Sequence, residues 1–373
     1  MMRTFKYRLY PTKAQAVILE THLRLCCELY NAALQERRDA WKIRQQSISF
    51  RVQSAQLPAI KTERSDVKEV YAQVLQDTLH RVDKTFQSFF GRLKRGDKPG
   101  YPRFRSARRY DSLTYPQAGF AIDGHHLKLS RIGRIKIKLH RPSEGKLKTL
   151  TIKREAGKWY ACFSVEVEPR PLPASSEAIG IDVGLTHFAT LSNGTEIENP
   201  RHYRQAEKQL RIAQRKVARR KKGGRNRAKA IRLLQVAHAR IRNQRSNFHH
   251  QLSRLLVNQN ELIAVEDLNI KGLARSRLAK SINDAGWSSF INMLAYKAES
   301  AGRLLMKVDP RGTSQTCLCG NAVPKTLSDR WHDCSACGLS APRDQVSAQL
   351  ILGLGLSLCA SMWPVAACIA QEA

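Results

Sequence analysis

Three acidic residues stand where predicted strands end or a predicted helix begins. Asp182 ends the apolar stretch AIGID, Glu266 follows the apolar stretch ELIAV, and Asp344 precedes SAQLILGL, whose pattern predicts the final helix. We expect the three carboxylates to converge on one point. Crowded carboxylates stay ionised only beside cations, and Mg²⁺ prefers oxygen ligands. Two Mg²⁺ ions about 3.5 to 4 Å apart can activate a water and stabilise the leaving oxygen of a phosphodiester.

Each of these acids also has an ordinary structural explanation. Asp182 could lie in a turn, Glu266 could lie on the surface, and Asp344 could cap a helix. We favour a nuclease site because the three occur together in a strongly basic chain, and a basic protein attracts a phosphodiester substrate.

Four cysteines form a second candidate metal site. Cys317 and Cys319 lie in TCLCG, and Cys334 and Cys337 lie in DCSACG. The second pair has the CxxC spacing of a zinc ribbon, and four thiolates can close a tetrahedral Zn²⁺ site that folds a loop with little core of its own. The first pair is CxC, one residue shorter, so a loop without metal is the alternative.

Residues 201–245 form a strongly basic segment. It holds seventeen Lys or Arg and one acid, Glu207, and the pair Gly223-Gly224 is expected to divide it into two helices. A charged helix that only faces solvent is the alternative, but such helices usually mix both signs, so we favour phosphate binding. The cations that recur at helical spacing are Arg204, Lys208, Arg211, Arg215, Arg219 and Lys222.

The overall composition agrees with a nucleic-acid partner. The chain has 373 residues, 42% of them hydrophobic, and 64 Lys or Arg against 31 Asp or Glu give a net charge of +33. The hydrophobic share is sufficient for packed cores and excludes a disordered or fibrous chain. The charge requires a polyanion that neutralises it. Because the first residues, MMRTFKYRLY, lack an apolar signal core, we expect a cytoplasmic protein.

The first half of the chain alternates between strand and helix patterns. Residues 3–9 alternate as a strand, and helical patterns follow from Pro11-Thr12 to about Arg44 and from Val67 to Leu93. From Tyr101 to Val167 the period changes to two, with a hairpin that turns at Ala156-Gly157. This order indicates a β-rich module interrupted by helices.

The second half begins after a Pro-rich linker at residues 169–177. The strand AIGID is followed by a predicted hairpin with an Asn193-Gly194 turn, so the fold class is α/β and multidomain. Residues 350–370 are long and apolar enough to cross a bilayer. We prefer a buried helix followed by a loose apolar tail, because Gly353, Gly355 and Pro364 interrupt the run and no basic flank follows it.

Six motifs occur in order along the chain: KYRLYPTKAQ, IGIDVGL, IAVEDLNIKGL, TSQTCLCG, WHDCSACGL and APRDQVSAQLIL. Together they resemble the TnpB family of transposon-associated, RNA-guided DNA nucleases, from about residue 3 to about residue 355. The resemblance implies a RuvC-like, RNase H-type nuclease domain whose acids are Asp182, Glu266 and Asp344. It also implies a β-barrel-like wedge domain interrupted by a helical recognition domain.

These implied domains can be placed on the sequence. The wedge domain would comprise residues 1–11 and 98–172, and the recognition domain residues 12–97. The nuclease domain would comprise residues 173–373, with a basic helical insertion at 201–256 and a zinc ribbon at 313–340.

The resemblance also implies partners and cofactors. They are a guide RNA from the transposon end, a double-stranded DNA target beside a short motif, two Mg²⁺ ions with Mn²⁺ as a substitute, and one structural Zn²⁺. Gln76 and Thr114 occupy regions that touch the target-adjacent motif in relatives. Arg343, beside Asp344, could neutralise the scissile phosphate or lie on the surface. A monomer without membrane contact is expected.

Other functions fit parts of the same pattern. A guide-dependent DNA-binding repressor would not need three crowded acids. A DNA transposase is less favoured because the sequence shows no separate helix-turn-helix for binding DNA ends. A compact CRISPR type V effector would have nearly the same sequence features.

Overall fold

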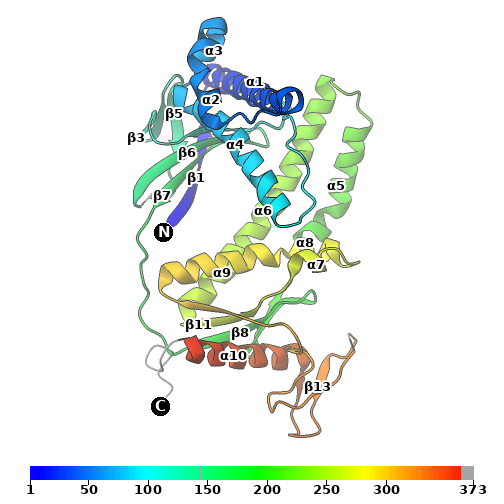
Figure 1. Ribbon diagram of the computed structural model, residues 1–373. Helices are drawn as coiled ribbons and strands as arrows, with labels where there is room; N and C mark the ends of the chain where they lie inside the picture. The colour runs from blue at the N-terminus through cyan, green and yellow to red at the C-terminus, as the bar shows by residue number, and fades with distance from the viewer. Residues whose placement is uncertain (143, 327, 363–373) are drawn as a thin grey trace. The chain divides into compact units, whose positions relative to one another are not determined.

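The computed structural model describes residues 1–142, 144–326 and 328–362 (Figure 1). The chain divides into two compact units, with the boundary between Val167 and Glu168. Each unit combines helices with a β-sheet, so the predicted mixed α/β class is confirmed. The finer assignment of wedge, recognition and nuclease domains stays a prediction.

The first unit is built on an antiparallel sheet of seven strands in the order β2-β6-β7-β1-β5-β4-β3. Its strands are β1 (Met2–Tyr10), β2 (Ser112–Tyr115), β3 (Phe120–Asp123), β4 (His126–Leu129), β5 (Gly133–Lys138), β6 (Lys146–Glu155) and β7 (Lys158–Glu166). The predicted hairpin is confirmed: Ala156 and Gly157 join β6 to β7 with φ angles of 49° and 73°. Two positive φ angles in a two-residue turn match the right-handed twist of the flanking strands.

The helices of the first unit are inserted between β1 and β2. They are α1 (Lys13–Arg44), α2 (Phe50–Ala55), α3 (Leu57–Glu63), the 3₁₀ helix η1 (Ser65–Glu69) and α4 (Ala72–Lys94). Thr12 caps α1 in a capping box with Gln15, which confirms the predicted start. The predicted helix from Val67 was wrong at its start, because Val67 lies in η1 and Val70 is extended. Val67, Val70 and Val74 keep a helical spacing, so the periodicity of apolar residues alone does not reveal this break.

The second unit contains a mixed sheet of five strands in the order β10-β9-β8-β11-β12. The strands are β8 (Ala178–Asp182), β9 (His187–Leu191), β10 (Glu196–Glu198), β11 (Leu262–Glu266) and β12 (Leu304–Val308). β11 lies between β8 and β12 and is parallel to both, whereas β9 is antiparallel to β8. The predicted Asn193-Gly194 turn lies between β9 and β10, with φ of 84° at Gly194.

Helices cover both faces of this sheet. The helices are α5 (His202–Ala218), α6 (Arg225–Gln259), α7 (Ile270–Leu273), α8 (Ala279–Ala285), α9 (Trp287–Ala301) and α10 (Arg343–Met362), and a small hairpin is formed by β13 (Trp331–Asp333) and β14 (Ser340–Pro342). Ile263 and Val265 of β11 pack with α6 and α9, whereas Leu262 and Ala264 pack with α10 (Figure 1). Burial of alternate residues on opposite faces explains why this strand is apolar throughout.

The basic segment forms two helices, α5 and α6, which meet at the predicted break near Gly223-Gly224. One part of the prediction was wrong. Arg219 caps the C-terminus of α5, and Lys222 lies in the turn that follows, so neither continues a helical stripe. α5 ends at Ala218, before the two glycines are reached, so charge spacing alone overestimates the length of this helix.

α10 is, within the described ranges, the one helix long and apolar enough to cross a membrane. It packs along the five-stranded sheet and buries Val346, Ile351 and Cys359. Packing on a sheet agrees with the preferred interpretation, a core helix. The predicted apolar tail, residues 363–373, lies outside the described residues.

Candidate active site and metal centre

Two of the predicted acids lie at matching ends of neighbouring strands. The parallel pairing of β8 with β11 runs from Ala178 opposite Leu262 to Ile181 opposite Val265. The next residue on each strand is Asp182 and Glu266, respectively. Neighbouring strands lie about 4.8 Å apart, and side chains at the same register point to the same face. The sheet therefore brings the two carboxylates together at its C-terminal edge.

Asp344 reaches the same region from the first turn of α10. α10 packs very close to β8: a Cβ atom at Gly180 would lie 2.1 Å from the carbonyl oxygen of Ala348. Gly180 is two residues before Asp182, and Ala348 is one helical turn after Asp344. The missing side chain at position 180 therefore allows the approach that brings Asp344 toward the other two acids.

The charges of the three acids influence one another. The pKa of Asp182 is raised to about 7, first by burial, then by repulsion from Glu266 and Asp344, against an opposing effect of Arg343. Burial also raises the pKa of Glu266, and the hydrogen bond from Thr313 opposes this rise. A buried carboxylate with two acidic neighbours requires cationic charge to stay ionised, and oxygen ligands of this kind suit a hard divalent ion.

Thr313 is a site residue that the sequence argument missed. Its hydroxyl lies 2.5 Å from Oε1 of Glu266 and 3.1 Å from the carbonyl oxygen of Pro310, and the residue is 4% exposed. The hydroxyl can donate to the carboxylate and fix its orientation. Thr313 begins the motif TSQTCLCG, but no spacing rule links a threonine to a glutamate 47 residues earlier in the chain.

Arg343 connects the start of α10 to the loop that precedes β13. Its Nη1 donates hydrogen bonds to the carbonyl oxygens of Thr326 and Asp329 at 3.0 and 3.1 Å. Its Nε lies 3.9 Å from Oδ1 of Asp344. Part of the guanidinium is thus held by the loop, and a role at the scissile phosphate stays a prediction.

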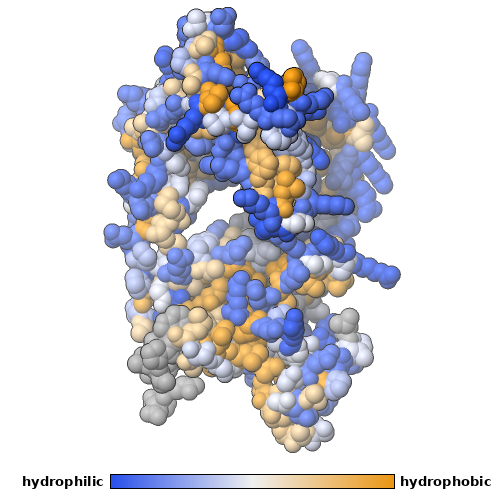
Figure 2. All heavy atoms as spheres, viewed as in Figure 1, coloured by the Kyte–Doolittle hydropathy of each residue, from blue (hydrophilic) through white to orange (hydrophobic). Residues whose placement is uncertain are grey.

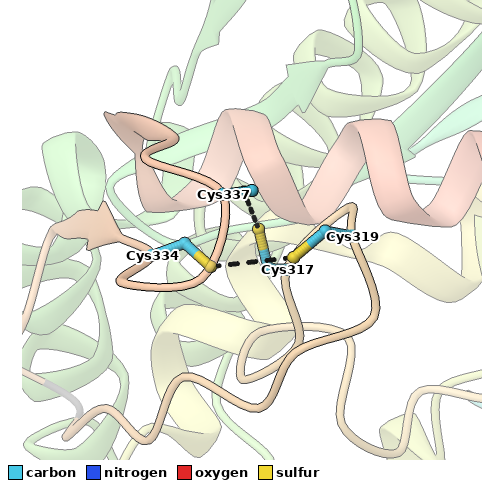
Figure 3. A group of neighbouring side chains, drawn as sticks. All are labelled: Cys317, Cys319, Cys334 and Cys337. Atoms are coloured by element: carbon cyan, nitrogen blue, oxygen red, sulfur yellow. Dashed lines mark hydrogen bonds between the residues drawn. The ribbon is translucent and has the colours of Figure 1, made fainter.

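The four cysteines gather into one cluster (Figure 3). The sulfur atoms of Cys317, Cys319, Cys334 and Cys337 all lie within 4.8 Å of one another. The Sγ atoms of Cys317 and Cys337 are 3.6 Å apart, and those of Cys319 and Cys334 are 3.7 Å apart. A tetrahedral Zn²⁺ site with bonds near 2.3 Å requires sulfur separations of about 3.8 Å. The shorter CxC pair therefore still presents both thiols, and the cluster could bind a structural metal.

One thiol in this cluster is predisposed to ionise. The pKa of Cys334 is lowered to about 6, chiefly because the backbone amides of Cys337 and Ala336 donate to its sulfur. A thiolate is the form that binds a metal ion. His332, which is fully buried in β13, contacts Nζ of Lys325 through Nδ1 and is not part of the cluster.

The predicted phosphate-binding cations lie on the exposed surface of α5 and just beyond it. Arg204, Lys208, Arg211, Arg215, Arg219 and Lys222 are all exposed. Figure 2 shows mainly hydrophilic side chains over α5 and α6. The helix is anchored by Asp284 of α8, whose carboxylate accepts the backbone N–H groups of Tyr203 and Arg204 at 2.8 and 3.1 Å. This N-terminal cap comes from 80 residues away, so the local sequence gave no signal for it.

The two residues expected near a target-adjacent motif lie on different elements of the first unit. Gln76 is exposed on α4, and Thr114 is half-buried on β2. The hydroxyl of Thr114 accepts a 2.7 Å hydrogen bond from Nη2 of Arg81, which links α4 to β2. It also lies 3.1 Å from the hydroxyl of Thr151. A DNA-contacting role for Gln76 and Thr114 stays a prediction.

Three family models match separate parts of the chain. A model described as "Probable transposase" matches residues 162–277, and one described as "Cas12f1-like, TNB domain" matches residues 287–351, which include the cysteine cluster. A model described as "Helix-turn-helix domain" matches residues 1–46. In the structure this last segment is β1 followed by the single helix α1 and its cap, so no helix-turn-helix forms within residues 1–46.

Two named relatives align with almost the whole chain. A protein of Streptomyces pristinaespiralis named "Putative RNA-guided DNA endonuclease" is 36% identical over 366 residues, which cover 95% of this chain and 90% of the relative. "Putative RNA-guided DNA endonuclease InsQ" of Escherichia coli (strain K12) is 28% identical, with 95% and 92% covered. A solved structure of the mini-RNA-guided endonuclease CRISPR-Cas_phi3 has a TM-score of 0.48 at 9% identity, with 95% and 92% covered.

The extent of the first alignment, together with the transposase and TNB matches, decides the family. The chain belongs to the TnpB family of RNA-guided DNA endonucleases.

Proposed function

We propose that this chain hydrolyses target DNA at Asp182, Glu266 and Asp344 with two bound Mg²⁺ ions. The observation that carries the proposal is the matched position of Asp182 and Glu266 at the ends of β8 and β11, with α10 delivering Asp344 against the same sheet. The resulting repulsion on Asp182 favours bound cations. Mn²⁺ would substitute, since it accepts the same oxygen ligands.

The residues of the chain would have distinct roles at this site. Divalent ions held there would supply an activated water and a stabilised leaving oxygen. Asp182, Glu266 and Asp344 would hold these ions through their carboxylate oxygens. Thr313 would orient Glu266 through the 2.5 Å contact to its Oε1. The second unit would accordingly be the RuvC-like nuclease domain, with the sheet and α10 as its frame.

The nucleic acids would be held by surfaces separate from this site. We assign guide RNA and target DNA to the exposed cations of α5 and the following turn, because the net charge of +33 requires a polyanion. Base pairing to the guide would then select the target, while the protein reads backbone shape and a short adjacent motif. The antiparallel sheet of the first unit would be the wedge domain, and its inserted helices the recognition domain.

Zn²⁺ would occupy the cysteine cluster as a structural ion. All four ligands would come from the protein, which leaves no open position for catalysis. The metal would fold the loop between β12 and α10 and thereby support Thr313 and Arg343, which lie on either side of the cluster.

The test is a plasmid-cleavage assay with guide RNA from the transposon end and Mg²⁺. We expect Asp182→Ala to abolish cutting while RNA and DNA binding persist, because the carboxylate acts on chemistry and the basic surface acts on affinity. Binding without cutting by the native chain would indicate a guide-dependent repressor instead. Joined transposon ends in place of cut plasmid would indicate a transposase.

A further inference from the structure

The segment that follows α4 combines cations with aromatic rings. Residues 101–109, YPRFRSARR, hold four arginines, one tyrosine, one phenylalanine and no acid. The segment is fastened to α1: Asn31 donates to the carbonyl oxygen of Arg105 and accepts from its N–H, both at 2.8 Å. The guanidinium of Arg105 also lies over the ring of Tyr30, 5.2 Å from its centre. The segment is therefore held in a defined place although it has no regular secondary structure.

A cavity of about 640 Å³ opens between this segment and the C-terminal part of α1. Trp41 and Phe104 line it with 55% and 50% of their surface exposed. Tyr101, also in the lining, is held by Phe86 and Phe89, whose ring centres lie 6.0 and 5.5 Å from its own in edge-on arrangements. Exposed large rings at a fixed cavity are typical of a surface that a ligand covers.

The charges around the cavity define the kind of ligand. Its cationic lining residues, Arg38, Lys42 and Arg103, form no ion pair or side-chain hydrogen bond with any other residue that the structure describes. The lining includes no acid. A ligand that satisfies both features has a flat apolar face and a negative charge nearby, which is the chemistry of a nucleotide whose base is not paired.

We propose that this cavity binds an unpaired nucleotide of single-stranded RNA, with its base stacked against Trp41 or Phe104 and its phosphates near Arg38, Lys42 and Arg103. We choose RNA because proteins recognise RNA mainly through unpaired bases in loops and at ends, which stack on aromatic rings and arginine planes. The DNA alternative is the strand that is displaced when the guide pairs with its target, and a deoxy oligomer in the same assay tests it. The inference rests on the proposed function for the origin of this RNA, but not for the chemistry of the cavity.

The test uses the full chain carrying Asp182→Ala and an eight-nucleotide oligouridylate with 5-iodouracil at its centre, without divalent ions. We expect ultraviolet irradiation to link the base to a peptide that contains Trp41 or Phe104. The double variant Trp41→Ala/Phe104→Ala should lose this link and bind the oligomer about tenfold more weakly, as expected for one lost stacking contact. Affinity for an abasic oligomer of the same length and charge should stay unchanged in the double variant.

Two control variants make the result specific. Ile43→Ala removes an even more exposed apolar side chain, 77% exposed, from the same last turn of α1. It should leave both the cross-link and the affinity unchanged, and Trp41→Phe/Phe104→Tyr should retain both because the rings remain. Cross-links found only in other peptides, or equal weakening by Ile43→Ala, would overturn the proposal.

The same cross-linking assay with a deoxy oligomer distinguishes binding of RNA from binding of DNA. If the deoxy oligomer links to these peptides and the RNA does not, the cavity binds a DNA strand and the proposal is wrong. Because this assay requires neither cleavage nor metal, a failure of the proposed nuclease activity would not affect it. Conversely, absence of the cross-link would overturn the proposal for the cavity, but it would not bear on the proposed nuclease activity, which the plasmid assay tests.

Discussion

Gly180 of β8 and Ala348 of α10 are in backbone contact, since a Cβ atom at position 180 would lie 2.1 Å from the carbonyl oxygen of Ala348. A second close approach occurs farther along the helix, where a Cβ at Gly355 would lie 2.5 Å from Cβ of Ala264. One glycine on the sheet, Gly180, and one on the helix, Gly355, thus allow α10 to pack closely against the sheet. Because Asp182 lies on β8 and Asp344 lies on α10, this close packing controls the geometry of the proposed metal site.

Gly180→Ala should therefore weaken both stability and cleavage. The added methyl group must push α10 away, and overpacking of this kind costs about 1 to 3 kcal/mol of unfolding free energy. We expect a lower thermal midpoint and at least a tenfold slower cleavage, with guide RNA binding retained. Gly353→Ala is the matched control, because a Cβ there would meet no atom within 4 Å and alanine favours a helix. If both variants cut DNA like the native chain, the close packing of α10 on β8 does not control the proposed metal site.

Asp182→Asn should change how stability depends on pH in Mg²⁺-free buffer. The pKa of Asp182 is raised in the folded state from 3.8 to about 7, so the unfolded chain loses this proton first as pH rises. The free energy of unfolding therefore falls between about pH 4 and pH 7, and the asparagine avoids this loss. We expect the variant to match the native chain near pH 4 and to exceed it by about 4 kcal/mol at pH 8, since each unit of pKa difference corresponds to about 1.4 kcal/mol. Urea unfolding at the two pH values measures the difference.

Added Mg²⁺ provides the internal control for this experiment. If the cation binds the ionised carboxylates, it should stabilise the native chain at pH 8 more than the variant. A variant advantage that is equal at both pH values would contradict burial of a charge at position 182.

Thr313→Val should weaken the response to Mg²⁺ without affecting guide RNA binding. Valine has nearly the same shape but cannot donate to Oε1 of Glu266, so the pKa of Glu266 should rise further above its ordinary value. We expect the Mg²⁺ concentration for half-maximal cleavage to increase several-fold. Thr313→Ser keeps a hydroxyl and should retain most of the native response. Equal behaviour of the two variants would argue against a hydrogen-bonding role.

The sequence was sufficient to predict the elements that carry the acids. Asp182 and Glu266 each end a short apolar run, and a strand buried on both faces requires such a run. The Asn193-Gly194 and Ala156-Gly157 turns were equally clear, because few residues adopt positive φ angles. Local chemistry therefore predicted the strands, their ends and their turns.

The contacts that complete the site could not be predicted in this way. Thr313 contacts Glu266, and Asp284 caps α5, only after distant segments have packed together. No pattern in the local sequence predicts either contact. The break between η1 and α4 was also hidden, because Val67, Val70 and Val74 keep a helical spacing across it. Tertiary packing, more than local propensity, decides such features.

Cys334→Ser should release the structural metal. The native chain is expected to carry about one Zn²⁺, measured by elemental analysis, and the variant close to none, with a lower thermal midpoint because metal binding stabilises the folded loop. Cys162→Ser is the control, because Cys162 lies on β7 in the first unit and outside the cluster. Unchanged zinc content in Cys334→Ser would contradict the four-cysteine site.

Lys208→Ala and Arg215→Ala should each weaken guide RNA binding in a salt-dependent way. Both side chains are exposed on α5. Removing one phosphate contact should reduce the slope of log affinity against log salt by about one, without changing sequence preference. Arg64→Ala removes the same net charge, but its guanidinium is already paired with Asp66 and Glu28 at 2.7 and 3.1 Å. An equal loss in all three variants would mean that net charge, and not the surface of α5, holds the RNA.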